Sequence, residues 1–210
     1  TDKVMTSKVR SIKDTYHGIL FQKINAIEGN FLTLNRNDRE RLFKNTELVM
    51  DFSTSIAVER KLVNDERTFR RCTSFLNPKG DDVVLLMEDK ERNSRLDLLE
   101  MDYYRNLIVD DRFSQHLEQT ETVRTNTFSC RSESMILNYE NVRVLSAIIS
   151  KQIRKHYTSG KACLNIWHFD AEDGIVLSLP MTITNWHHEA LGGIQIYISD
   201  AVEKEIQTMA

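Results

Sequence analysis

The sequence lacks the short signatures that mark common catalytic centres. Ser178 stands between two leucines, without the G-x-S-x-G pattern of a nucleophile elbow. The tripeptide Ser159-Gly160-Lys161 matches only the end of a phosphate-binding loop, because the upstream glycines of that motif are missing. We therefore expect a chain that carries out no reaction itself and that needs no cofactor.

Cysteines are few and widely spaced. The three cysteines, Cys72, Cys130 and Cys163, form no C-x-x-C pair, so the spacing supports neither a zinc ribbon nor a thioredoxin-like motif. Their odd number excludes complete internal pairing. Two interpretations remain open: a Cys72–Cys130 disulfide in an exported protein, or buried free thiols, which are the more common state.

Long apolar runs and an excess of one charge are also missing. No run approaches the roughly 20 residues that cross a bilayer, and no signal-peptide pattern is present. The formal net charge is −3, with basic and acidic residues mixed along the chain. Because nucleic-acid binding normally needs a basic face, we expect no nucleic-acid partner.

Prolines and glycines are scarce, with two and seven respectively, which suits long uninterrupted helices. The spacing of apolar residues predicts a first helix over 8–34 and, after a break with a new N-cap at 35–38, a second over 39–63. The stripe of the first helix fits either a buried helix face or the seam of a homodimer. Its residues are Leu20, Ile24, Ile27, Phe31 and Leu34.

The middle of the chain alternates between helix and strand signals. Asn77-Pro-Lys-Gly80 is the strongest turn signal, because proline presets φ and glycine accepts a positive φ. The apolar run Val83–Met87 after it predicts a buried strand. The remaining predictions are a polar loop at 88–94, helices at 96–107 and 110–119, a strand at 122–128, and a helix at 141–157 that ends at Ser159-Gly160.

The last fifty residues contain three runs of β type, Cys163–Phe169, Ile175–Ile183 and Gly192–Ser199, separated by polar breaks. Such a pattern is typical of a small antiparallel sheet. The sequence therefore predicts an α/β fold of the α+β kind, with long N-terminal helices packed on one face of a central antiparallel sheet.

This order of elements resembles the PAS-like extracytoplasmic sensor domains of bacterial membrane receptors, called PDC or Cache domains. At residue level the resemblance rests on Leu179-Pro180, near the end of the penultimate strand, and on Gly192-Gly193, which opens the last strand. The amine-recognition signature of that family has no clear counterpart here. The resemblance implies an N-terminal helical stalk over 1–65, a PAS-like sensor domain over 66–200 and the start of an exit helix over 201–210.

The resemblance also implies a function. We expect the non-catalytic, periplasmic sensing domain of an inner-membrane receptor, of the histidine kinase or diguanylate cyclase type, with flanking membrane segments outside the given sequence. Its partner would be a small molecule or a periplasmic protein, and its N-terminal helix could form a homodimer. The alternative is a cytoplasmic PAS- or GAF-like regulatory or protein-interaction domain.

Four residues are candidates for lining a ligand pocket: Trp167, Tyr139, Arg143 and Arg131. Strand alternation puts Asn165, Trp167 and Phe169 on one face, with Ile166 and His168 on the other. Core packing is the competing interpretation for Trp167, and a surface position is the competing one for Arg143. For Arg131 the alternative to an acidic ligand is an ordinary surface ion pair.

Two aromatic-histidine clusters stand out, Trp167-His168 and Trp186-His187-His188-Glu189. A zinc site needs three or more ligands that converge. The neighbours His187 and His188 would point in different directions on most backbones. We therefore expect solvated histidines and no metal site.

Overall fold

The computed structural model describes residues 27, 29–53, 55–65, 67–118, 138–191 and 194–199, with the backbone alone for 187–191 and 194–199. The chain divides into two compact units between Lys44 and Asn45. The first unit contains a 3-10 turn, η1 (Phe31–Thr33), and a short helix, α2 (Arg36–Leu42). The second unit contains the remaining elements.

The first unit is built from capped turns. The Asn35 side chain accepts a hydrogen bond of 2.9 Å from the Asp38 N–H. The N-cap therefore lies in the predicted segment 35–38, but the helix begins at Arg36 rather than at Arg39. The rings of Phe31 and Phe43 meet edge to face, with centroids 5.9 Å apart. Most of the predicted helix over 8–34 lies outside the described residues, and the part within them is only η1. Long N-terminal helices are therefore not confirmed.

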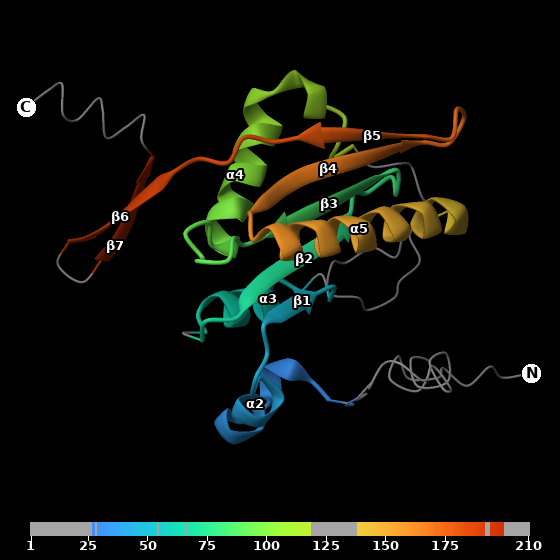
Figure 1. Ribbon diagram of the computed structural model, residues 1–210. Helices are drawn as coiled ribbons and strands as arrows, with labels where there is room; N and C mark the ends of the chain where they lie inside the picture. The colour runs from blue at the N-terminus through green and yellow to red at the C-terminus, as the bar shows by residue number, and fades with distance from the viewer. Residues whose placement is uncertain are drawn as a thin grey trace, which may run out of the picture. The chain divides into compact units, whose positions relative to one another are not determined.

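The second unit is a mixed α/β fold around a five-stranded sheet (Figure 1). The strand order is β1-β2-β3-β4-β5, in which β1 runs parallel to β2 and every other neighbouring pair is antiparallel. The predicted α/β class and the largely antiparallel sheet are confirmed. The strands are β1 (Leu48–Asp51), β2 (Arg70–Leu76), β3 (Asp82–Met87), β4 (Cys163–Asp170) and β5 (Ile175–Pro180).

Helices cover both faces of this sheet, which corrects the expectation of one covered face. Helix α5 (Tyr139–Ser159) packs Leu145 and Ile149 against Leu85 and its neighbours on one face. Helix α4 (Leu96–Val109) packs on the opposite face, together with Val63 of α3 (Ile56–Val63). All six residues of β3 are buried, as expected for an apolar run covered on both sides.

The predicted second helix over 39–63 is wrong, because a strand interrupts it. Helix α2 ends at Leu42, the chain extends as β1 from Leu48, and α3 begins only at Ile56. Strand β1 is four residues long and gains its hydrogen bonds from β2, about twenty residues further along the chain. Tertiary pairing therefore overrides an apolar spacing that fits a helix.

The prediction that the last three strands share one sheet is also wrong. Strand β5 ends at Pro180, and β6 (Trp186–Leu191) pairs with β7 (Ile194–Ser199) in a separate two-stranded sheet. Side chains of α4 hold the intervening segment. Asn106 bonds both the N–H and the C=O of Thr182, and Asp102 accepts a hydrogen bond of 2.8 Å from the Thr184 N–H.

Several local predictions are confirmed. The turn at 77–80 forms, with Gly80 at φ 75°, and the loop, α4 and α5 follow as expected. Helix α5 ends at Gly160, which adopts a left-handed conformation with φ 72°. The predicted helix over 110–119 is only a 3-10 turn, η2 (Asp111–Phe113). The predicted strand over 122–128 and the predicted exit helix over 201–210 lie outside the described residues.

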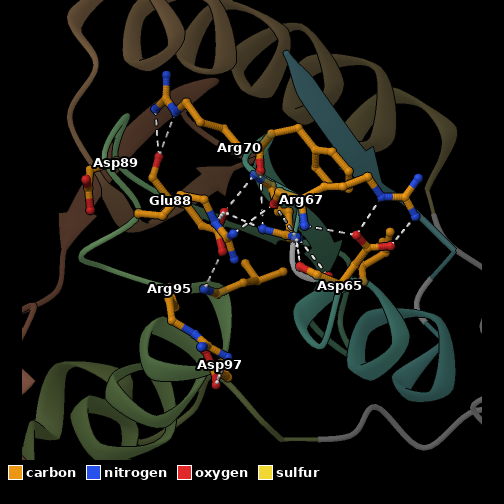
Figure 2. A network of polar contacts seen from close by, with 12 residues as sticks. Asp65, Arg67, Arg70, Glu88, Asp89, Arg95 and Asp97 are labelled. Carbon is orange, nitrogen blue, oxygen red and sulfur yellow. Dashed lines mark hydrogen bonds and ion pairs between the residues drawn. The ribbon is translucent and has the colours of Figure 1, made fainter. Parts of the chain in front are cut away.

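A buried charge network joins the ends of β2, β3 and α4 (Figure 2). Both Arg71 and Glu88 are fully buried, and their side chains form an ion pair of 3.4 Å. Glu88 also accepts hydrogen bonds from the Arg71 N–H, from Arg92, and from the Leu96 N–H at the start of α4. Burial lowers the pKa of Arg71, and the charge of Glu88 opposes that effect.

The rest of the Arg71 guanidinium bonds to backbone. It donates to the carbonyl of Leu62, in the last turn of α3, and to the carbonyls of Asp65, Arg67 and Phe69, in the segment between α3 and β2. Neighbouring Arg70 donates to the Glu88 carbonyl and to carbonyls at the C-terminal end of α5. Two adjacent arginines of β2 therefore tie the helices of both faces to the sheet.

We predict that Glu88→Gln lowers the free energy of unfolding by about 3 kcal/mol, because it leaves the Arg71 charge buried without its partner. Denaturant unfolding followed by circular dichroism measures this. As a matched control, Glu118→Ala removes the exposed partner of Lys79 and should cost less than about 1 kcal/mol. Equal losses in the two variants would contradict the central role of Glu88.

Candidate functional site

An apolar groove of about 750 Å³ lies beside β1, one of the two edge strands of the sheet. Helix α5 packs on β3 and β4, and the groove runs along its flank over the β1 and β2 end of the same face. This volume lies in the usual range of small-molecule sites. The groove is lined by Glu47, Leu48, Met50, Phe52, Ser74, Phe75, Leu76, Val83, Ser146, Ile149, Ser150, Ile153, Arg154 and Tyr157.

The floor and the wall of the groove are mainly hydrocarbon. Leu48 and Met50, two residues apart on β1, lie on the face of the strand that lines the groove. Ile149 and Ile153 line it from successive turns of α5. Met50 and Phe52 remain about half exposed, at 50% and 54%. Exposed apolar side chains that gather in one concave place indicate a binding site for an apolar molecule.

Polar groups stand among the lining residues of this groove. The Tyr157 hydroxyl donates a hydrogen bond to the Glu47 carboxylate, which links the end of α5 to the residue before β1. This hydrogen bond raises the pKa of Tyr157. Arg154 also lines the groove and is exposed, and its guanidinium has no hydrogen-bond or ion-pair partner within the described part of the chain. These groups can fix the polar end of an otherwise apolar ligand.

The structure places three of the four predicted ligand residues, Trp167, Tyr139 and Arg143, away from this groove. Trp167 is buried in the core beneath α5, on the same face as Phe169, as the alternation along β4 indicated. Tyr139 and Arg143 lie together at the start of α5, where the Arg143 guanidinium stacks 4.3 Å from the centre of the Tyr139 ring. None of these lines the groove, and Arg131 lies outside the described residues.

Sequence reasoning missed the groove because it missed β1, which supplies part of the floor. The wall residues on α5 were within a correctly predicted helix. Ser146 and Ser150, four residues apart, lie on the same side of α5, next to the buried Ile149. Two small polar residues beside an apolar one leave room on that side of the helix. This spacing predicts a groove only when the neighbouring strand is known.

A second, smaller cavity of about 200 Å³ is polar and shares no lining residue with the groove. The Asp82 carboxylate stands between two histidines there: its two oxygens lie 2.6 Å from His116 Nδ1 and 2.6 Å from His168 Nδ1. The second ring nitrogen of His116 is 2.9 Å from the Tyr103 hydroxyl. The sequence placed His168 in a candidate cluster, but nothing local connected it to Asp82 or to His116. Side chains of His187 and His188 lie outside the described part.

Cys72 and Cys163 are buried free thiols on the α5 face of the sheet. Burial raises the pKa of each to about 12, so both stay protonated near neutral pH. Cys130 lies outside the described residues, so a bond between it and Cys72 stays a prediction.

Neither models of known protein families nor curated proteins match this sequence. Within the described residues, no helix has both the length and the apolar content that a membrane span requires. The site is therefore interpreted from its own geometry.

We predict that Cys72 and Cys163 resist alkylation in the folded protein, because the reactive thiolate is scarce and both sulfurs are buried. Treatment with iodoacetamide at pH 8, followed by peptide mass spectrometry, should label them only after unfolding in denaturant. Rapid labelling of either residue in the native protein would show that the core around β2 and β4 opens.

Proposed function

We propose that this chain is a non-catalytic sensor domain that binds a small, mainly apolar molecule in the groove between α5 and the edge strand β1. The observation that carries the proposal is the groove itself, with its apolar floor and its half-exposed Met50 and Phe52. Arg154 and the Tyr157–Glu47 pair give the ligand one polar end to recognise. An anionic group beside Arg154 is the best electrostatic match.

The walls of the groove supply a route for a signal. One wall is α5, and Arg70 donates hydrogen bonds to the carbonyls at the end of this helix. The floor includes β1, which begins only a few residues after the boundary between the two units. A ligand shifts an equilibrium only if it binds two conformations unequally. A molecule wedged between α5 and β1 would favour one spacing of these elements, and β1 would pass the change to the preceding chain.

The wider setting follows the resemblance described above. In our proposal the domain is the periplasmic sensor of an inner-membrane receptor, of the histidine kinase or diguanylate cyclase type, and it forms homodimers through its N-terminal region. The five-stranded sheet with flanking helices is compatible with a PDC or Cache domain, and equally with a cytoplasmic PAS- or GAF-like regulatory domain. Two buried free thiols fit the cytoplasmic alternative as well as the periplasmic one.

We predict that the groove binds 1-anilinonaphthalene-8-sulfonate, an apolar ring system with one anionic group, and that Ser146→Trp weakens this binding at least tenfold by filling the groove. A fluorescence titration measures the dissociation constant. Ala147→Trp adds the same side chain at an exposed position of α5 that does not line the groove, so it should bind like the parent protein.

Cooperative thermal unfolding of each variant must accompany this titration, because the probe also binds partly unfolded chains. If the folded parent protein does not bind the probe, or if both tryptophan variants bind it equally, the groove is not the site.

The cellular setting has a separate test in the gene that encodes this chain. We predict that the reading frame encodes apolar spans of about 20 residues on both sides of the present sequence. Reading the frame beyond Thr1 and Ala210 decides this. If neither side encodes a span, the periplasmic setting fails and the cytoplasmic regulatory domain is the better account, whatever the groove binds.

A further inference from the structure

Three potential metal ligands converge in the lining of the polar cavity. One ligand atom each from Asp81, Asp82 and His168 lies within 4.8 Å of the others. Asp82 is buried, whereas Asp81 and His168 are partly exposed and line the cavity. Two carboxylates and one imidazole at this separation are a set that can close around a single ion and leave further positions open.

The backbone fixes this convergence. Asp82 is the residue of β3 directly opposite His168 of β4, and the Phe169 N–H donates a 2.7 Å hydrogen bond to the Asp81 carbonyl. On the other side, the Asn77 side-chain oxygen accepts hydrogen bonds from the N–H groups of both aspartates. The turn and the strand pair therefore hold the three residues in place before any ligand arrives.

Each carboxylate has an outer partner of the kind that orients metal ligands. The Asn77 amide donates to Asp81 Oδ1 at 2.7 Å. His116 Nδ1 lies 2.6 Å from Asp82 Oδ2, so the other oxygen of Asp82 is directed to His168. His116 is itself fixed by Tyr103, and both are buried.

The charges nearby favour a cation. Lys79 and Arg112 also line this cavity, but each is engaged in an ion pair, Lys79 with Glu118 at 2.8 Å and Arg112 with Asp110 at 2.7 Å. The Asp81 carboxylate has no ion-pair partner among the described residues, and its hydrogen bond comes from a neutral amide. Two adjacent aspartates beside one histidine thus leave negative charge at the cavity.

We propose that Asp81, Asp82 and His168 bind a divalent transition-metal ion of the Zn²⁺ type. On binding, the His168 ring carries its proton on Nε2, and Nδ1 donates its lone pair to the ion. The Asp82 oxygen that faces His168 becomes the second ligand, Asp81 supplies the third, and water completes the coordination. The His116–Asp82 contact stays as an outer-shell bond. This site is separate from the apolar groove and does not depend on the proposed function.

The test is isothermal titration calorimetry of the metal-free 210-residue chain with ZnCl₂. We expect one ion per chain. Asp81→Asn keeps the shape of its side chain but removes a charge, and His168→Ala removes the nitrogen ligand. Each should weaken binding at least tenfold, while a His187→Ala/His188→Ala double variant should bind like the parent protein.

Three outcomes overturn the proposal: no binding by the parent protein, undiminished binding by both Asp81→Asn and His168→Ala, or a loss confined to the His187/His188 variant. Since His168→Ala also removes the contact with Asp82, thermal unfolding without metal shows whether that variant folds. Asp81→Asn provides the test if it does not. Ser146→Trp should leave Zn²⁺ binding unchanged, which separates this site from the groove.

Discussion

The packing of the second unit depends on the buried ion pairs and hydrogen bonds of the Glu88 carboxylate. This carboxylate is a single buried anion at the end of the central strand β3, and it meets Arg71 from β2, Arg92 from the following loop and the first N–H of α4. Because charges without partners are costly in a core, these elements can be buried only together. The hydrogen bond from the Leu96 N–H to Glu88 Oε1 also caps the start of α4, since the residue before the helix, Arg95, provides no side-chain cap.

The sequence was sufficient for elements that are decided by their own residues. The Asn77–Gly80 turn, the apolar β3 and the long α5 with its glycine stop depend on local φ preferences and spacing, and all were predicted. Elements decided by distant partners were not. Strand β1 needs β2 for its hydrogen bonds, and the segment after Pro180 leaves the sheet because Asn106 and Asp102 of α4 supply its hydrogen bonds instead.

The same division applies to the candidate sites. Alternation along β4 placed Trp167 and His168 on opposite faces correctly, since a period of two is local. It could not show which face carries a cavity. The groove arises where α5 crosses the sheet, and the polar cavity arises where β3, β4 and the segment after η2 meet. Both depend on packing between elements far apart in sequence.

The segment Thr182–Trp186, which follows β5 and is bonded to α4, lies on the opposite face of the sheet from the groove. The chain enters this sheet at β1, beside the groove on the α5 face, but it leaves the sheet along Thr182–Trp186, which is bonded to Asp102, Arg105 and Asn106 of α4. The entry thus borders the α5 face, and the exit is attached to the α4 face. In our proposal a ligand in the groove acts on β1 and therefore on the incoming chain, whereas the outgoing segment is bonded to α4 on the other face. The five-stranded sheet therefore lies between the groove and the segment that leads to β6.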